Sequence, residues 1–495
     1  MNEEVRYALR DLGERMPAAR LASDPWLVGR RQRRRAARRT GVVAVVAVLV
    51  GVLGLFAVLR GSGAGTMPAA AGEGVPARIS LPWMWQATVE QDPPGPASVL
   101  FGGGGFGLRG IDFVDHEGKI AVVGRGGDYR MLLYGGHEST AGEGVQLSPD
   151  GRYVAHNPGD DWLTVTDLTD ASDRAYSGPP DSDCCASPIA WSRDGGTLVV
   201  LDSTVESLDD RYRRIWESGS SVYGQPVTLS RLTLVDLGTG TTRVLLDGLG
   251  DWESLRTASL AAFSPDGMRI AATVGNRLSL LDRDGRTLWS RDLGPRRKLA
   301  GHGAFTADGS RIAVTDLEGC LLDCDTAALA ARTWTVTWLD AATGQDVTGP
   351  TLAPVQGQAL RALGWRLGTD LVAVRYEAGG GMIEGAGWND TGYWESGRVQ
   401  LIALRPDGTT EVLVDPPDEV WSLDVARDLL EAGAFGAPAT EPRPFPARPL
   451  ILLVAVPPAL LVAVVVGVLL LWRRHRRWLR MIRSTPPMTD PPWPA

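Results

Sequence analysis

The chain has 495 residues, a formal net charge of −8 and four cysteines. It is longer than the roughly 250 to 300 residues at which a single hydrophobic core stops growing, which excludes an ordinary one-core domain and favours several domains or a closed array of repeats. Residues 61–448 carry 32 basic and 52 acidic side chains. A body this acidic is repelled by phosphate backbones, so nucleic acid is not expected as its ligand.

Residues 1–40 are expected to form a cytoplasmic segment. Apolar residues recur there at helical spacing, which predicts a short amphipathic helix before an arginine cluster at 30–39. Such a helix can dock a cytosolic partner, lie on anionic lipid or remain a solvated leader. This helix, the Asp24-Pro25-Trp26 motif and the arginine cluster resemble the amino ends of bacterial membrane proteins related to anti-sigma factors, although the zinc-ligand motif of that group is absent. The resemblance implies a transcription factor as cytosolic partner.

Two apolar segments, 41–59 and 450–472, contain no charged residue and are long enough to cross a bilayer as helices. Arginines precede the first segment and follow the second, so the positive-inside rule places both termini in the cytoplasm and the body outside. A cleaved signal peptide ending near Ala69 is the alternative for the first segment, and a buried core helix for the second. The remaining parts of this two-span cell-membrane protein are a linker at 60–76, the body at 77–435, a proline-rich linker at 436–449 and a basic tail at 473–495.

A nine-residue phrase, FSPDGMRIA at 263–271, recurs in altered forms along the body. Each copy has a large apolar residue followed seven positions later by an aliphatic one, and the Pro, Asp and Gly between them favour a tight hairpin. The seven pairs are Phe113 and Ile120, Leu147 and Val154, Trp191 and Leu198, Phe263 and Ile270, Phe305 and Ile312, Trp365 and Val372, and Leu423 and Leu430. The repeat-turn residues are Pro149, Asp150, Gly151, Asp194, Gly195, Pro265, Asp266, Gly267, Asp308 and Gly309, with degenerate turns from Arg366 and Asp424.

A third, apolar strand follows most hairpins, as in LTLVDLGTG from Leu232, and a poorer fourth strand comes after it, as in TRVLLDG from Thr242. Four short antiparallel strands per repeat are one propeller blade. The pattern resembles bacterial TolB-like and degenerate WD40-like propellers over residues 75–433, which implies an architecture rather than a ligand. We therefore predict an all-β seven-bladed β-propeller flanked by two transmembrane helices, with a barrel or a two-sheet sandwich as the alternative.

The seventh predicted blade lacks outer strands, because few residues follow Leu430 before the proline-rich linker. Strands from the amino end, ARISLPWMW from Ala77 and ASVLFGG from Ala97, are expected to complete it and to remove the exposed edges of an open array. A body that begins with a third strand and ends after a second strand releases both termini on one face. That face would then look toward the membrane.

Three long segments, 203–227, 316–332 and 377–397, each follow a second strand of the predicted blades and therefore map to the same face. Two of them repeat a local pattern, IWESGS from Ile215 and YWESGR from Tyr393, that combines aromatic and charged residues as binding loops do. Simple drift in loop length is the alternative. The candidate binding residues are Tyr212, Trp216, Tyr223, Trp388, Tyr393 and Trp394.

The four cysteines, Cys184, Cys185, Cys320 and Cys324, lie in the part of the chain placed outside the cell, where disulfides are permitted. Each doublet can close on itself, or the two doublets can pair with each other. Zinc is the competing interpretation, but no histidine lies beside either pair.

No catalytic, cofactor-binding or metal-binding residue is predicted, because the five histidines are scattered and no nucleophile-elbow or zinc pattern occurs. We expect a non-enzymatic membrane protein whose propeller binds or scaffolds a protein or envelope ligand close to the lipid bilayer. The alternatives are a transmembrane anti-sigma-like regulator whose residues 1–40 hold a transcription factor, and a propeller hydrolase or lyase. The enzyme hypothesis predicts at least two titratable groups with strongly shifted pKa values in one site.

Overall fold

The computed structural model describes residues 74–83, 86–103, 118–134, 141–157, 161–180, 182, 186–203, 230–247, 261–321, 324–378, 396–438, 441–442 and 463–478. Residues 1–40, the first predicted span, Cys184, Cys185 and all six aromatic residues predicted for the binding face lie outside the described residues. Residues 463–478 are helical and include the end of the second predicted span. Within the described part of the chain, no helix is both long enough and apolar enough to cross a membrane.

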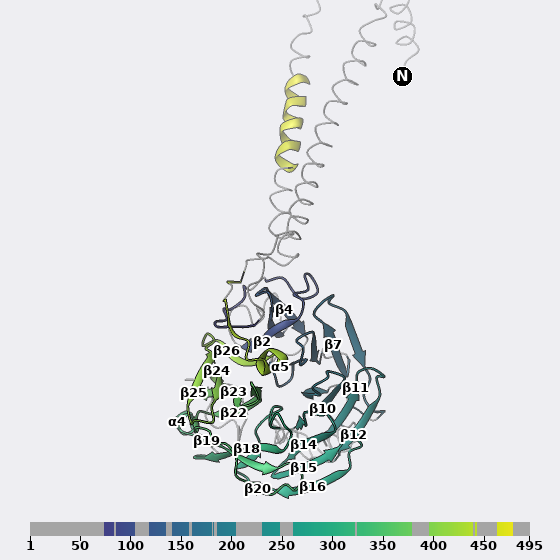
Figure 1. The fold of residues 1–495 in the computed structure, drawn as a ribbon. Coiled ribbons are helices and arrows are strands. Elements are labelled where there is room, and N and C mark those ends of the chain that lie inside the picture. Colours follow the sequence, from purple (N-terminus) through teal and green to yellow (C-terminus); the bar gives the residue numbers. More distant parts are fainter. Residues whose placement is uncertain are drawn as a thin grey trace, which may run out of the picture. The chain divides into compact units, whose positions relative to one another are not determined.

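Among the described residues, short antiparallel strands form six sheets of four or five strands, arranged around a ring (Figure 1). In five of these blades the strands pair in chain order, and the first strand lies nearest the centre of the ring. The first two are β5 (Gln146–Leu147), β6 (Tyr153–His156), β7 (Leu163–Asp167) and β8 (Asp173–Tyr176), then β9 (Ser187–Trp191), β10 (Thr197–Ser203), β11 (Ser230–Asp236) and β12 (Thr242–Leu246).

The next three blades continue in the same order along the chain. They are β13 (Ala261–Phe263), β14 (Arg269–Val274), β15 (Arg277–Asp282) and β16 (Thr287–Asp292); β17 (Arg297–Leu299), β18 (Arg311–Glu318), β19 (Thr333–Asp340) and β20 (Asp346–Val347), with β21 (Val355–Gln356) also paired to β19; and β22 (Ala359–Arg366), β23 (Asp370–Ala378), β24 (Ser396–Leu404) and β25 (Thr410–Val414). Helix α4 (Thr326–Ala330) lies between β18 and β19.

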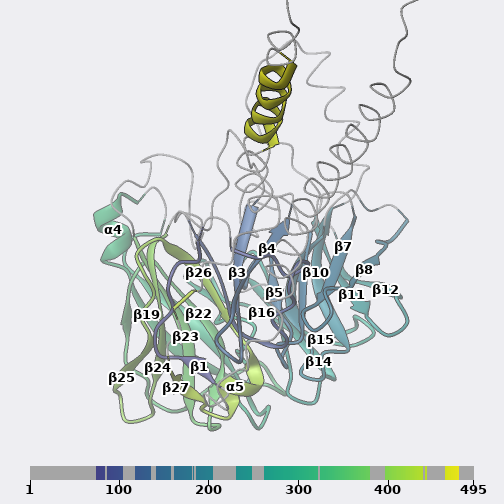
Figure 2. The same ribbon diagram turned by 90° about the horizontal axis from the view of Figure 1, so that it is seen from above.

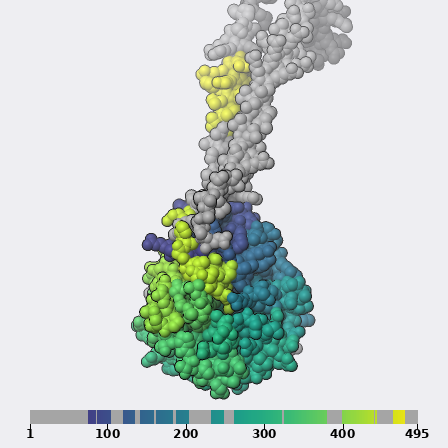
Figure 3. All heavy atoms as spheres, viewed as in Figure 1, coloured from purple at the N-terminus to yellow at the C-terminus, as the bar shows by residue number. Residues whose placement is uncertain are grey.

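The sixth blade, called the closure blade below, joins the two ends of the ring. Its strand order is β26 (Val420–Val425), β2 (Ala97–Gly103), β3 (Gly118–Gly124) and β4 (Tyr129–Tyr134). The carboxy-terminal β26 pairs antiparallel with the amino-terminal β2, with Val425 opposite Val99. Figure 3 shows the purple and yellow-green parts of the ring side by side. Closure by an amino-terminal strand is therefore present, although residues 77–83 contribute no strand to the blade.

The predicted number of seven blades is wrong, because the first and last predicted hairpins belong to this one sheet. Ile120 lies in β3, the third strand of the closure blade, and Leu423 lies in its first strand. The chain after Val425 does not turn back as a hairpin, because β2 takes the place of the second strand beside β26. It forms helix α5 (Arg427–Glu431) instead, and Leu430 is buried in that helix. A spacing of seven between apolar residues is therefore not specific for the first hairpin of a blade.

Four first hairpins share one turn geometry, which the turn at Ser264 illustrates. The Ser264 hydroxyl donates to Asp266 Oδ1 at 2.5 Å, the same oxygen accepts the Met268 N–H at 3.0 Å, and Gly267 has a φ of +67°. These bonds stabilise the charged carboxylate and lower the pKa of Asp266. The equivalent hydroxyl-to-carboxylate bonds join Ser148 to Asp150, Ser192 to Asp194 and Thr306 to Asp308.

The two faces of the ring differ. We call the face with the turns between first and second strands the turn face, and the opposite face, where second strands connect to third strands, the loop face. Figure 2 shows α5 with β1 (Val75–Pro76) and β27 (Phe435–Ala437) at one face and α4 at the other. Since β26 is a first strand, the body ends on the turn face and not after a second strand as predicted. The prediction that the loop face looks toward the bilayer depended on an end after a second strand, so it loses its basis.

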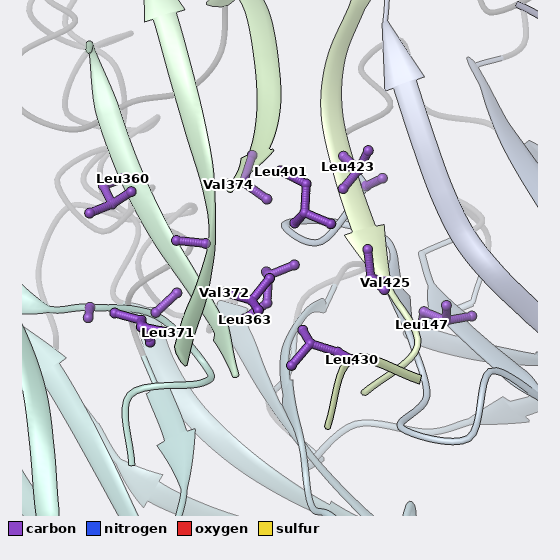
Figure 4. Packing of buried hydrophobic residues seen from close by; sticks show 14 of the residues in the cluster. Leu147, Leu360, Leu363, Leu371, Val372, Val374, Leu401, Leu423, Val425 and Leu430 are labelled. Carbon is purple, nitrogen blue, oxygen red and sulfur yellow. The ribbon is translucent and has the colours of Figure 1, made fainter. Parts of the chain in front are cut away.

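The core lies between the blades and consists mostly of aliphatic side chains from the first three strands. Figure 4 shows Leu363, Val372, Leu401 and Leu423 converging from four strands with Leu430 of α5, and all five are 1% exposed or less. Alternating β-branched and leucine side chains suit this packing, because each sheet buries both of its faces against its neighbours.

The segment directly after β17 is joined by hydrogen bonds to β22, the first strand of the next blade. The Gly303 N–H donates to the Ala362 carbonyl at 3.1 Å, and the Ala362 N–H donates to the Ala300 carbonyl at 2.7 Å. A Cβ atom at Gly303 would lie 2.2 Å from the backbone of Leu363 and Gly364. Glycine is therefore required at position 303 for the close approach of these two blades.

Candidate functional site on the propeller axis

Arg361 is the central side chain of a polar cluster on the inside of the ring, called the axial cluster below. It comes from the first strand β22, is completely buried and donates to backbone carbonyls and to a tyrosine hydroxyl. Its guanidinium reaches the Leu423 carbonyl at 2.5 Å, the Gly142 carbonyl at 3.2 Å and the Tyr376 hydroxyl at 3.0 Å. These acceptors belong to three consecutive blades, so one side chain ties the closure blade to both of its neighbours.

Glu143 is an acidic member of the axial cluster, and its pKa lies near neutral pH. Its Oε1 lies 3.1 Å from the Tyr376 hydroxyl, and the residue keeps partial exposure. Burial raises the pKa of Glu143 to about 7, against the opposing effects of the Arg361 charge and the Tyr376 hydrogen bond. Glu143 is therefore partly protonated at neutral pH.

Asp424 is the second carboxylate of the cluster and is 3% exposed. Its Oδ2 accepts the Leu147 N–H at 3.0 Å, which joins the closure blade to the blade that begins with β5. Burial raises the pKa of Asp424, while Arg361 and the backbone bonds act to lower it.

His302 faces the same region from the strand segment after β17. Its Nδ1 is buried and has no hydrogen-bond partner among the described residues. Burial lowers the pKa of His302 well below its ordinary value, and the charges of Arg361 and Arg427 lower it further. The imidazole is therefore neutral at physiological pH.

Helix α5 lies across the inside of the ring on the turn face (Figure 1). Its ends are bonded to four blades. The Asp428 and Glu431 side chains accept hydrogen bonds from Arg125 at 2.5 Å and from Arg193 at 2.6 Å. Backbone bonds join the helix to the Pro149 carbonyl and the Leu367 N–H. The side chains of Leu429 and Leu430, which belong to this helix, are buried. A ligand that reaches the axial cluster would therefore approach from the loop face.

The loop face carries the three long segments that the sequence singles out. The connections at 204–229, 319–332 and 379–395 each join a second strand to a third strand, as predicted from the chain order. Only 319–332 lies mostly within the described residues, and it contains the Cys320–Cys324 disulfide and α4. The structure places the repeat-turn residues on the other face, where they close hairpins.

The sequence reasoning missed the axial cluster. A weak signal existed, because Arg361 interrupts the apolar run of β22 and Glu143 stands in a Gly-Glu-Gly segment that carries no recognised motif. Their proximity depends on the ring bringing positions more than 200 residues apart together, which spacing along the chain does not reveal. Among the described residues, no three His, Cys, Asp or Glu side chains are grouped so that they could hold a metal ion.

No family model and no curated protein matches the chain. Solved structures to which it is similar include an oligogalacturonate lyase in complex with manganese, at 15% identity, with 68% of this chain and 77% of that chain covered and a TM-score of 0.39. They also include TolB from Acinetobacter baumannii (15% identity, 64% and 62% covered, TM-score 0.33) and a putative TolB from Agrobacterium tumefaciens (14%, 65% and 93%, 0.30). TolB structures are therefore among the neighbours, and the propeller fold itself rests on the strand order of the six sheets.

Proposed function

We propose that this protein is a two-span cell-membrane protein whose extracytoplasmic propeller binds or scaffolds a protein or envelope ligand without catalysing a reaction. The membrane part of the proposal rests on the uncharged segments 41–59 and 450–472 and their arginine flanks. The binding part rests on the propeller, an architecture that presents loops from a rigid ring.

The difference between the two faces of the ring is the observation that carries the binding function. The turn face is occupied by tight turns and by α5, whose polar ends are bonded to four blades. The second strands that lead into the connections at 204–229, 319–332 and 379–395 end on the loop face, and two of these connections contain the six predicted aromatic residues. Binding surfaces are commonly built from such loops on a rigid scaffold. We therefore assign the ligand to the loop face.

A specific observation favours catalysis as a second candidate. Glu143, Asp424 and His302 all have shifted pKa values and share Arg361 as a charged neighbour. A carboxyl group with a pKa near 7 suits a general acid or base. Against this, Glu143 and Arg361 bond to groups of the protein itself, as expected for a cluster that stabilises the ring.

Site-specific photo-crosslinking in cells that naturally make the protein tests the binding proposal. A photoreactive residue is placed in the full-length chain at Glu318 or Ala330, which are exposed on the loop face, or at the matched controls Met268 and Leu367, which are exposed on the turn face. We expect one defined partner to be crosslinked from the loop face and not from the turn face. Crosslinks to that partner from the turn face alone would contradict the assignment. Reporters fused to both termini test the two-span topology separately.

Chemical modification of His302 distinguishes catalysis from a purely structural axis. Diethyl pyrocarbonate acylates neutral imidazole, so a substrate-accessible axis predicts modification of His302 in the folded, full-length chain. The structural interpretation predicts that His302 reacts only at the rate of unfolding, whereas His475, in the exposed helix at 463–478, reacts at once. Rapid modification of His302 would favour the enzyme alternative.

A further inference from the structure

The described part of the loop between β18 and β19 is organised around a buried arginine. The Cys320–Cys324 disulfide closes this loop, with the two Cα atoms 5.9 Å apart. Arg332, the residue before β19, is 1% exposed. Its guanidinium donates to the Cys320 carbonyl at 2.8 Å and to the Leu321 carbonyl at 3.0 Å.

The same guanidinium also contacts one of the two sulfur atoms. Arg332 Nη2 lies 3.4 Å from the Sγ atom of Cys324. A disulfide sulfur is neutral and accepts hydrogen bonds weakly, whereas a thiolate is an anion that a neighbouring arginine stabilises strongly. The contact is therefore better matched to the reduced form of Cys324 than to the disulfide, and both cysteines remain partly exposed.

We propose that Cys320–Cys324 is a thiol–disulfide exchange site that accepts electrons from a dithiol protein, with attack at Cys320 and with Cys324 as the leaving thiolate. A thiolate of the dithiol forms a bond to Cys320 Sγ, and the electron pair of the Cys320–Cys324 bond moves to Cys324 Sγ beside Arg332. The second thiolate of the dithiol then attacks its partner sulfur and releases Cys320. The dithiol is oxidised to a disulfide, and the two cysteines of this chain take up two electrons.

Three other charged groups in the described part of the loop are hydrogen-bonded elsewhere or exposed to solvent, and Asp323, which precedes Cys324 in the sequence, lies outside the described residues. Arg296 donates to the carbonyls of Leu317 and Gly319, on the Cys320 side of the loop. Asp325 follows Cys324, but its Oδ1 accepts the Ala328 N–H at 2.7 Å as the cap of α4. Glu318 is exposed to solvent and is screened there. Arg332 contacts the Cys324 sulfur directly.

Reduction would alter the loop face, which gives the proposed chemistry a structural consequence. The disulfide holds residues 320 and 324 together, and Arg332 also donates to the Gln358 carbonyl at 3.3 Å, just before β22. Opening the disulfide releases the loop end while Arg332 remains held by the neighbouring blade. The inference does not depend on the proposed binding function, since it concerns only the reactivity of the two sulfur atoms.

The first test measures the acidity of each thiol in the full-length chain. Cys184 and Cys185 are replaced by serine, and the pH dependence of iodoacetamide alkylation is compared between C320S, which leaves Cys324, and C324S, which leaves Cys320. We expect Cys324 to titrate at least about one pH unit below Cys320. R332K should keep this difference and R332Q should abolish it, while R296Q, which removes a cation from the same loop, should leave it unchanged.

The second test identifies the sulfur that is attacked. The disulfide form is treated with a limiting amount of glutathione, and the mixed disulfide is located by peptide mass spectrometry under acid quench. We expect glutathione on Cys320 at least about tenfold more often than on Cys324. Equal thiol acidities in the presence of Arg332, or predominant labelling of Cys324, would overturn the proposal. This comparison holds even if R332Q fails to fold.

Discussion

Replacing Glu143 by glutamine should make the protein more stable at alkaline pH. The pKa of this carboxyl group is about 7 in the folded protein against an ordinary value of 4.5, mainly because of burial. Each pH unit of such a difference corresponds to about 1.36 kcal/mol, so the ionised carboxylate destabilises the fold by up to about 3 kcal/mol. Glutamine has nearly the same shape, still offers an oxygen to the Tyr376 hydroxyl and carries no charge.

The sign of the pH dependence follows from proton binding. Between pH 4.5 and 7 the folded state binds more protons at Glu143 than the unfolded state, because the folded pKa is raised. The contribution of Glu143 to the free energy of unfolding therefore falls as the pH rises through this range and is level above it. The E143Q variant should match the native chain at pH 4 and exceed it by the largest margin above pH 7.

Urea unfolding of the full-length chain in detergent, followed by tryptophan fluorescence at several pH values, measures this difference. The comparison must be made as a difference between variants, because His156 contributes the opposite slope. Burial lowers the pKa of His156 to about 4, so its contribution rises with pH from about 4 to 6.5. The exposed Glu90 provides the matched control, since E90Q removes the same charge outside the axial cluster. A difference between E143Q and the native chain that stays constant or shrinks with pH would refute the reasoning.

Two further substitutions test how the ring is held together. R361M should lower the free energy of unfolding by about 3 to 5 kcal/mol, because it leaves buried carbonyls, Tyr376 and Asp424 without their cation. R291M, which removes a part-exposed ion pair with Asp346, should lower it by about 1 kcal/mol or less. Equal losses in urea unfolding would argue against a special role for Arg361. G303A should lower the free energy of unfolding by about 3 kcal/mol, since its Cβ would lie 2.2 Å from the backbone of the next blade. The control G238A, whose Cβ would meet nothing closer than 3.4 Å, should change it by no more than about 0.5 kcal/mol. A G303A variant as stable as G238A would mean that the two blades can separate freely.

The repeat architecture could be predicted from the sequence because its signals are local. The Ser-Pro-Asp-Gly turn at Ser264 forms through bonds between residues at most five positions apart. Such bonds depend on residue type and spacing alone, which a single sequence displays. The alternation of apolar residues in strands such as β15 is local in the same sense.

The number of blades could not be read in the same way, because it depends on pairing between distant strands. Ile120 and Leu423 satisfy the same apolar spacing as true first hairpins, yet they belong to the third and first strands of one sheet. The axial cluster was missed for the same reason, since Glu143 meets Tyr376 only after the ring has closed. The outcome after Val425 depends on the same kind of distant pairing, since β2 takes the place of the second strand beside β26.

The closure blade also determines where the two ends of the ring lie. β1 and β27 pair in parallel, with Val75 opposite Phe435, and the indole N–H of Trp83 donates to the Pro442 carbonyl at 3.3 Å. The chain therefore enters and leaves the ring at adjacent points, so the linkers to the two predicted spans start side by side. β1 and β27 are the strands next to these linkers, so a force that separates the linkers would act first on the β1–β27 pairing and then on the β26–β2 pairing that closes the ring. We therefore expect that pulling the two predicted spans apart would be resisted first by the β1–β27 pairing and then by the pairing of Val99 with Val425 in the closure blade.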